Sequence, residues 1–273
     1  MILSTFRKPL DTFAPPVGRL YRVLRDATNR RRSIQTTTGF SLAGDPSMAK
    51  GGWEVDEIEA FLELMKTHDA VLDIGANVGF YSCLAASRGK HTIAFEPSSR
   101  NLKFLYRNLW ENRLFNVEVF PLGLGGRCGL GRIYGYGGIA SFVPGWGQAR
   151  KAQSSLVPLT TLDIIALGRF QNKKLLIKMD VEGFELDVLA GAAGTLALNP
   201  KPTWLVEIVL NGALIPGGIS EKFTETFEAF WNHGYQCRKL NPARTPVERA
   251  DVNRWVANRF VDSETQDFLF SAD

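Results

Sequence analysis

The chain has 273 residues, of which 45% are hydrophobic and 22% are charged, and these values are usual for a globular protein. They exclude a disordered chain, a collagen and a coiled coil, and no window approaches the roughly 18 consecutive apolar residues of a membrane-spanning helix. The start of the chain lacks the long apolar run of a secretory signal. The three cysteines are far apart, so we expect no disulfide framework and no metal site, and we predict a cytoplasmic protein.

Positive charge is concentrated at the start of the chain. The net charge is +4, yet residues 1–50 hold nine Lys or Arg against three Asp, and acidic side chains outnumber basic ones in the remainder. A nucleic-acid-binding protein would spread its charge differently and would carry a recognition motif, so we predict no nucleic-acid partner. We interpret residues 1–50 as a basic N-terminal extension and residues 51–273 as the main domain.

Within this extension, residues 17–27 have the spacing of a short amphipathic helix, and Arg30–Arg32 follow it. A solvated arm, or a helix packed on the main domain, is the plainer interpretation. The sharper hypothesis is peripheral contact of residues 1–32 with anionic lipid or an anionic glycan at the inner membrane face. Each base near an anionic bilayer contributes about 1 kcal/mol, and the apolar side chains of the helix could insert shallowly.

Helical and strand patterns alternate beyond residue 50. Apolar residues at spacings of three and four predict a helix from Glu54 to about residue 66, and short apolar runs predict buried strands. The predicted strands are 70–74, 92–96, 117–122, 175–180 and 204–208, and the further helices are 80–87, 98–109, 185–192 and 221–231. This alternation is typical of an α/β fold with a doubly wound, mostly parallel sheet.

One stretch interrupts the alternation. Residues 123–147 contain ten glycines with aromatic and β-branched residues between them. This pattern favours tight turns and short antiparallel strands on one rim of the sheet, and a flexible loop is the alternative. We therefore predict a glycine-rich β insertion in the main domain.

The clearest chemical signal follows the first predicted strand. The run from Val71 to Ser82 joins a strand end to a helix start through Gly75 and Gly79. Glycine allows backbone to approach a ligand, and a second glycine allows close packing of the helix. Glu96 ends the second strand 21 residues after Gly75, where a carboxylate can accept both hydroxyls of a ribose. These features predict a nucleotide-type cofactor, with a plain tight turn as the alternative.

The glycine spacing separates two cofactor classes. A dinucleotide site prefers G-x-G-x-x-G, whose helix N-terminus holds a pyrophosphate. Here the turn is Gly75-x-x-x-Gly79, with Ala76 nearest the missing middle glycine, and the carboxylate of Asp73 precedes it. That carboxylate would repel a pyrophosphate but suits a cationic ligand. S-adenosylmethionine has an ammonium, a sulfonium and no phosphate, so the charge pattern favours it over NAD.

Three motifs together resemble the FkbM family of methyltransferases. They are Asp73–Ser82, Phe95–Pro97 and Ile177–Glu185, and the similarity extends over roughly residues 52–240. Members of this family are class I, S-adenosylmethionine-dependent enzymes, commonly O-methyltransferases of sugars, glycolipids and polyketides. The resemblance thus implies a Rossmann-like sheet and methyl transfer to a hydroxyl.

The resemblance also implies roles for individual residues. The glycine turn would line the methionine end of the cofactor, Glu96 would hold the ribose, and residues 122–124 would touch the adenine. Asp180 would lie beside the transferring methyl, with Glu182 and Glu185 after it. The predicted cofactor-binding residues are Asp73, Gly75, Ala76, Asn77, Gly79, Tyr81, Glu96, Pro97, Gly123 and Asp180.

An alcohol acceptor needs a general base within hydrogen-bond reach of its proton. The candidates are Asp180, Glu185 and Glu207, and Asp180 is preferred because it ends a strand at the ligand rim. A capping carboxylate for the next helix is the structural alternative for Asp180. The three histidines lie away from that rim and are disfavoured. Lys178 shares a strand face with Asp180, and we expect it to pair with a carboxylate rather than to react.

Several alternatives remain open at this stage. Asp180 and Glu207 could hold Mg²⁺ together with a third oxygen ligand, although no close acidic cluster supports a metal site. The main expectation is O-methylation of a hydroxyl of a sugar, glycolipid, polysaccharide precursor or similar natural product, and this acceptor rests on the resemblance alone. N-methylation of a peptide or small amine, and cofactor binding without catalysis, are the other possibilities.

Overall fold

The computed structural model describes residues 33–135, 137–262 and 265–272, and the chain divides into two compact units, residues 1–53 and 54–273. The helix predicted at 17–27 and the membrane contact predicted for 1–32 lie outside the described residues. In the first unit, β1 (Ile34–Gln35) pairs with β2 (Ser41–Leu42) in antiparallel orientation, and α3 (Pro46–Ala49) follows.

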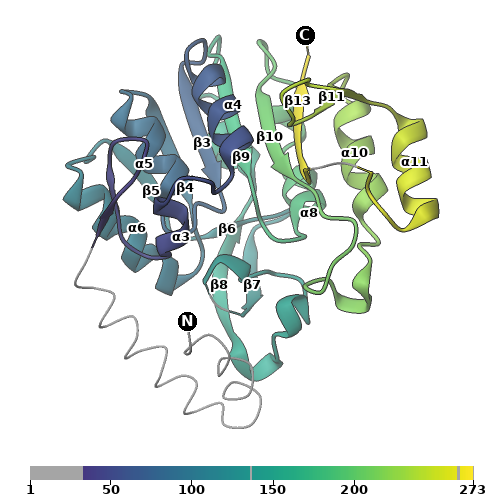
Figure 1. The fold of residues 1–273 in the computed structure, drawn as a ribbon, viewed down its shortest axis with the longest axis horizontal. Coiled ribbons are helices and arrows are strands. Elements are labelled where there is room, and N and C mark those ends of the chain that lie inside the picture. Colours follow the sequence, from purple (N-terminus) through teal and green to yellow (C-terminus); the bar gives the residue numbers. More distant parts are fainter. Residues whose placement is uncertain (1–32, 136, 263–264, 273) are drawn as a thin grey trace. The chain divides into compact units, whose positions relative to one another are not determined.

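Eight strands form the main sheet within the described part of the second unit (Figure 1). Their order is β12 (Pro246–Val247), β11 (Gln236–Lys239), β13 (Asp267–Ser271), β10 (Thr203–Glu207), β9 (Leu175–Met179), β3 (Ala70–Ile74), β4 (His91–Phe95) and β5 (Val117–Phe120). The strands from β10 to β5 are parallel to one another, whereas β13 is antiparallel to both β10 and β11. The predicted α/β fold with a mostly parallel, Rossmann-like sheet is confirmed.

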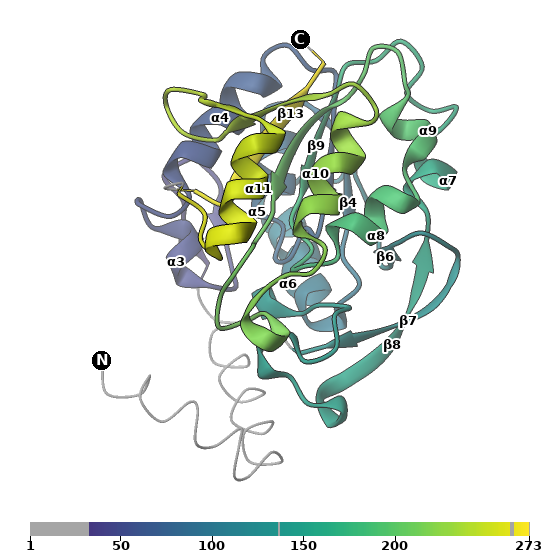
Figure 2. The same ribbon diagram turned by 90° about the vertical axis from the view of Figure 1, so that its right-hand side faces the viewer.

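Helices cover both faces of this sheet. One face carries α4 (Val55–Met65), α5 (Phe80–Ser87) and α6 (Ser99–Glu111), and the other carries α7 (Leu162–Ala166), α8 (Glu185–Ala190), α9 (Ala193–Leu196) and α10 (Phe223–Trp231). Figure 2 shows α4 and α5 on one side of the strands and α7, α8 and α9 on the other. A further helix, α11 (Arg249–Asn258), packs against α10, where Trp255 meets Phe223.

The central strand β3 is buried at every residue because helices cover both of its faces. Its alternate residues Leu72 and Ile74 join the larger hydrophobic core, with α8 and α10, while Asp73 points to the opposite face and contacts α5. The predicted strand 70–74 is observed with the same bounds. The other four predicted strands and the predicted helices after residue 54 are observed with ends that differ by a few residues.

The glycine-rich segment forms a small separate sheet of β6 (Gly123–Leu124), β8 (Ser154–Thr160) and β7 (Gly129–Tyr134). The predicted antiparallel pairing is confirmed for β7 with β8, whereas β6 runs parallel to β8. Three 3-10 turns lie between β7 and β8: Gly137–Ile139, Trp146–Gln148 and Lys151–Gln153. The insertion therefore continues to residue 160, beyond the stretch that its glycines mark.

None of the described helices combines the length and the apolar character needed to cross a membrane.

Candidate functional site

A cavity of about 560 Å³, open to solvent, lies at the carboxyl ends of the central parallel strands. Its walls come from the residues that follow β3, β4, β5 and β9, together with the insertion, which contributes Gly137, Gly138, Ala140 and Phe142. In open α/β sheets, ligands bind in the crevice beyond the strand carboxyl ends. The fold therefore places this cavity where a cofactor is expected.

The glycine turn after β3 is one wall of the cavity, to which Gly75 and Asn77 contribute. Gly75 has a φ of +84°, and a Cβ atom there would lie 1.8 Å from the Asp180 carbonyl oxygen. The backbone amide of Gly75 and that of Ala76 both donate to the Phe95 carbonyl oxygen, at 3.0 and 2.9 Å. The turn is thus fastened to β4 on one side and pressed against the end of β9 on the other.

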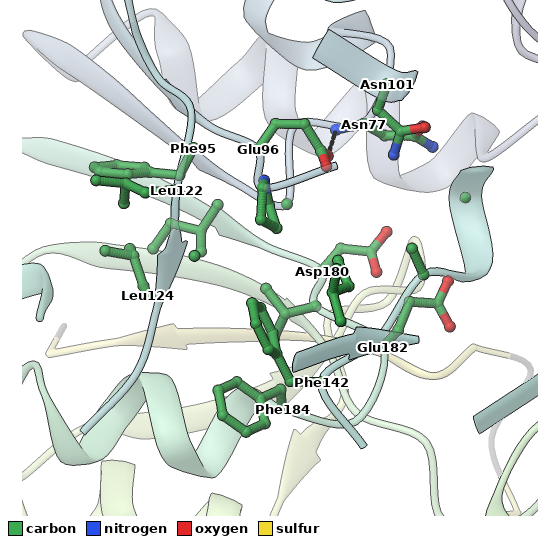
Figure 3. A pocket seen from close by; sticks show the side chains of 18 of the residues that line it. Asn77, Phe95, Glu96, Asn101, Leu122, Leu124, Phe142, Asp180, Glu182 and Phe184 are labelled. Atoms are coloured by element: carbon green, nitrogen blue, oxygen red, sulfur yellow. Dashed lines mark hydrogen bonds between the residues drawn. The ribbon is translucent and has the colours of Figure 1, made fainter. Parts of the chain in front are cut away.

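Glu96 is buried at the cavity wall, and both of its carboxylate oxygens accept backbone hydrogen bonds (Figure 3). The Asn77 amide donates to Oε2 at 2.8 Å, and the Ser98 amide donates to Oε1 at 2.7 Å. Each oxygen keeps a second lone pair that could accept a ligand hydroxyl. Burial raises the pKa of Glu96 to about 7, against the lowering effect of these hydrogen bonds.

An apolar part of the cavity lies beside Glu96. Phe95, Leu122 and Leu124 gather on one side of it, and Phe142 and Phe184 approach from another (Figure 3). The Phe142 and Phe184 rings pack against each other with centroids 4.9 Å apart. Such a surface beside a carboxylate suits an aromatic base attached to a ribose.

Four of the ten predicted cofactor-binding residues are not among those that line the cavity, namely Asp73, Ala76, Gly79 and Tyr81. The Ser82 hydroxyl donates to Asp73 Oδ2 at 2.5 Å, and the Tyr81 hydroxyl donates to Glu54 at 2.7 Å. A Cβ atom on Gly79 would collide with Leu105 of α6, so this glycine serves helix packing. Gly75, Asn77, Glu96, Pro97, Gly123 and Asp180 do line the cavity.

Asp180 follows β9 and lines the cavity next to the glycine turn (Figure 3). Its side chain is 34% exposed, so a ligand can reach it. Its Oδ1 atom is buried and accepts no hydrogen bond from any side chain or backbone group in the described residues. The charge of Asp180, and then burial, raise the pKa of Glu207 well above its usual value. The two carboxyl groups are therefore close enough to influence each other, and Asp180 is the member of the pair that lines the cavity.

Glu185 rather than Asp180 lies at the start of the following helix, α8, whose N-cap residue Phe184 has no side-chain cap. Glu185 is buried at the first residue of α8, and its Oε1 accepts a hydrogen bond from the Gly183 amide at 2.9 Å. Burial raises the pKa of Glu185 to about 7. Neither Glu185 nor Glu207 is among the residues that line the cavity, so Asp180 is the member of the predicted catalytic set that an acceptor can meet.

The three histidines lie away from the cavity, as the sequence predicts. His68 bonds to the Leu64 carbonyl and to Thr203, His91 bonds to Glu118, and His233 bonds to the Ala229 carbonyl. Each ring has a structural partner near an element end. None of the three lines the cavity.

Glu182, which the family resemblance places just after Asp180, also lines the cavity. Its φ is +56°, a left-handed conformation that is costly for a residue with a side chain. Trp146 donates from its indole nitrogen to Glu182 Oε2 at 2.8 Å, and Ser141 donates to the Glu182 carbonyl at 2.6 Å. Both partners come from the insertion, so Glu182 connects the insertion to the strand ends, a contact that no local pattern reveals.

Lys178 pairs with a carboxylate, and this prediction is confirmed. Its ammonium lies 2.9 Å from Glu57 of α4 and 3.8 Å from Asp180. No group of three or more metal-ligating side chains that could hold an ion occurs among the described residues.

The cavity suits S-adenosylmethionine in its charge as well as its shape. Glu96 offers carboxylate oxygens at the apolar wall, and Asp180 brings an acidic side chain to the other end, where a sulfonium and an ammonium would lie. Gly75 places no side chain between these regions. The backbone amides there are engaged with Phe95, so they are not free to bind a pyrophosphate.

Comparisons with known proteins agree with this geometry. The methyltransferase FkbM domain matches residues 73–237 of the chain. The hexuronic acid methyltransferase AglP of Haloferax volcanii is 28% identical over 149 residues, which are 52% of this chain and 58% of AglP. The chain therefore spans little more than half the length of that relative.

Two solved structures are similar to this chain at lower levels. A methyltransferase FkbM from Methylobacillus flagellatus has 23% identity, with a TM-score of 0.37, over 52% of this chain and 33% of its own. Fibrillarin of Aeropyrum pernix, solved with bound S-adenosyl-L-methionine, has 11% identity and a TM-score of 0.42, over 78% of this chain and 73% of its own. Because the matched domain covers more than half of the chain and contains the glycine turn, Glu96 and Asp180, the protein belongs to the FkbM methyltransferase family.

Proposed function

We propose that this protein is an S-adenosylmethionine-dependent O-methyltransferase that acts on a hydroxyl of a sugar, glycolipid or polysaccharide precursor. The observation that carries the proposal is the position of Asp180, which lines the same cavity as Glu96 and has a side chain that a ligand can reach. This arrangement supplies a hydrogen-bond acceptor for the ribose hydroxyls at one end of the cavity and a proton acceptor at the other. The named activity of AglP supports a sugar acceptor.

When bound, S-adenosylmethionine supplies an electrophilic methyl group on a sulfonium and leaves as a neutral thioether. The roles of the chain follow from its own geometry. Glu96 holds the ribose, and the apolar wall of Phe95 and Leu122 receives the base. Asp180 takes the proton of the acceptor hydroxyl as that oxygen forms its new bond to the methyl carbon. The insertion residues over the cavity limit water near the reacting atoms.

The basic segment, residues 1–32, suggests where in the cell the enzyme acts. Residues 1–32 hold eight Lys or Arg and two Asp, which suits a peripheral contact with anionic lipid or an anionic glycan. An acceptor carried on a lipid would make such a contact useful, because the enzyme would stay at the surface where its substrate resides.

An acceptor screen tests the proposed function. The full chain is incubated with S-adenosylmethionine that carries a deuterated methyl group and with pools of neutral sugars, uronic acids, lipid-linked glycans, peptides and amines. Mass spectrometry then identifies the labelled product. We expect label on a hydroxyl oxygen in a carbohydrate pool. Label on nitrogen would overturn O-methylation, and cofactor binding without label in any pool would indicate a binding protein.

A further inference from the structure

A buried ion pair lies directly behind the proposed base, and one of its members comes from outside the matched domain. Glu57 is in α4, before the domain match begins at residue 73, and its side chain is 4% exposed. It contacts the ammonium of Lys178, whose side chain is 3% exposed, at 2.9 Å. Burial of two charges costs free energy that their mutual attraction often only offsets, so stabilisation of the fold is a weak explanation for this pair.

The register of the sheet explains why Lys178 points toward Asp180. Side chains two residues apart in a strand share a face, so Lys178 and Asp180 project to the side that α4 covers. The register of β9 with β10, and of β10 with β13, brings Glu207 and Asp267 to the same face. Carboxyl groups from four elements thus surround one ammonium.

The carboxylates around the Lys178 ammonium lie at different distances from it. Lys178 lies 2.9 Å from Glu57 but 3.8 Å from Asp180, so its short contact is with the helix and its longer contact is with the proposed base. Burial alone would lower the pKa of Lys178, but Glu57 and Asp180 raise it well above its usual value, and the ammonium stays charged. Burial would likewise raise the pKa of Glu57, yet Lys178 and the hydrogen bond with Glu54 leave it lowered.

We propose that Glu57 is a positioning residue for the methyl-transfer base, because its contact with the Lys178 ammonium at 2.9 Å keeps that ammonium 3.8 Å from Asp180, near the carboxylate but too far away for a tight ion pair. This proposal rests on the proposed function. A tight pair between Lys178 and Asp180 would stabilise the carboxylate and make it a weaker base.

A test of the titration of Asp180 has to take account of every ionisable group near its carboxylate. Those that act on it directly are Asp73 of β3, Lys178 of β9, Glu182 after β9, Glu185 of α8, Glu207 of β10 and Asp267 of β13. Glu54 and Glu57 of α4 and Tyr81 of α5 surround the Lys178 ammonium. Lys178 is the only cation among them. Removing the negative charge of Glu57 and removing the positive charge of Lys178 are therefore the two most direct tests of the role of Lys178.

The experiment follows the carboxyl carbons of the full chain by carbon-13 NMR between about pH 4 and pH 9. The Asp180 resonance is assigned by its loss in Asp180→Asn, and the pH midpoint of its titration is measured. We expect Lys178→Met to raise this midpoint by about 1–3 pH units, since an opposite charge at this distance has an effect of that size. Glu57→Gln should lower it by about 1 unit, because Lys178 then closes on Asp180.

The control is Glu59→Gln, an exposed position on the same helix, which should leave the midpoint unchanged. A rise in the midpoint in Glu57→Gln would overturn the proposal, because it would mean that Lys178 had left Asp180. An unchanged midpoint would overturn it as well, because Glu57 would then serve the fold alone. The lowering should disappear when Glu57→Gln is combined with Lys178→Met, because loss of the Glu57 charge alone would lower the midpoint in both backgrounds. Should Lys178→Met not fold, Lys178→Gln serves the same comparison.

This measurement needs no acceptor, so its result is separate from the acceptor screen. A chain that shows the two opposite shifts and labels no hydroxyl would keep the positioning role and lose the proposed function. Where turnover is found, the acid limb of its pH profile should move in the same two directions, and a purely structural role of Glu57 would not move that limb.

Discussion

Gly75 and Asp180 touch at the ends of the two central strands, where a Cβ atom on Gly75 would lie 1.8 Å from the Asp180 carbonyl oxygen. The Asp180 amide also donates to the Ile74 carbonyl at 3.0 Å, so the two strand ends are joined just before the glycine turn. The turn that borders the cofactor cavity and the residue that faces the acceptor are therefore one rigid unit. A shift of one of them has to move the other.

Gly75→Ala should consequently destabilise the fold as well as the cofactor site. The Gly89→Ala variant is a matched control, because Gly89 has a φ of +76° but nothing within 4 Å of its Cβ position. We expect Gly89→Ala to lower the free energy of unfolding by about 1–2 kcal/mol, the cost of the left-handed backbone. Gly75→Ala should cost more than about 4 kcal/mol in urea unfolding. Equal costs would mean that the contact with Asp180 relaxes easily.

Asp180→Asn keeps the shape of the side chain and removes its basicity. Turnover should fall by about 10²–10⁴, the usual contribution of a general base, while cofactor affinity stays within a few fold. Glu185→Gln is the comparison, since that carboxylate bonds to the Gly183 amide and does not line the cavity. Wild-type turnover in Asp180→Asn would assign the base elsewhere, with Glu207 as the next candidate.

Affinity for S-adenosylmethionine should depend on the ionisation of Glu96. Its pKa is raised to about 7 by burial, and its charged form is the better acceptor for ribose hydroxyls. Affinity should therefore be full above pH 8 and should weaken as the pH falls through 7. Isothermal titration of the wild type and of Glu96→Gln checks this, because the variant should bind weakly at every pH. A parallel pH slope in both proteins would assign the dependence to another group.

Chelation separates acid–base catalysis from the metal alternative. With Asp180 as the base, EDTA should leave the rate of methyl transfer unchanged. A Mg²⁺-dependent enzyme would lose its activity in EDTA and recover it when the metal is restored. The measurement is an initial rate before chelation, after chelation and after repletion.

The basic segment can be tested with vesicles. Deletion of residues 1–32 should leave cofactor binding intact and reduce co-sedimentation with vesicles that contain phosphatidylglycerol, more at low salt than at high salt. Vesicles of phosphatidylcholine alone serve as the control. If the full chain and the shortened chain sediment equally at low ionic strength, the membrane contact is absent. If the shortened chain does not fold, the segment packs on the main domain instead.

Local sequence patterns were sufficient to predict the part of the fold that carries the proposed cofactor site. The strand at 70–74 is an uninterrupted apolar run that stops at a glycine, and Glu96 stands one residue after β4, so both could be located from the sequence. Parallel strands then bring their carboxyl ends to one edge. Nothing beyond the order of elements was needed to place Gly75, Glu96 and Asp180 together.

Contacts between distant segments could not be read in the same way. The apolar spacing of α4 assigns Val55 to its buried face, yet Val55 is 48% exposed and Glu57 is buried. A buried acid is recognisable only when its partner, Lys178, is known to lie opposite. The strand β11 is polar in sequence, and Trp146 and Phe142 come from a glycine-rich segment, so neither their strand pairing nor their cavity contacts has a local signature.

The position of β13 has a consequence for synthesis of the protein. This strand, residues 267–271, lies between β10 and β11, so the ribosome makes both neighbours before the strand that joins them. Until then β10 has an open edge, which is a surface prone to pairing with other chains. Asp267 also pairs in register with Glu207, so the acidic surroundings of the proposed base are complete only once this late segment has docked. In a nascent chain the position between β10 and β11 therefore stays unfilled until β13 has been synthesised. A chaperone that shields the edge of β10 during this time would favour correct folding.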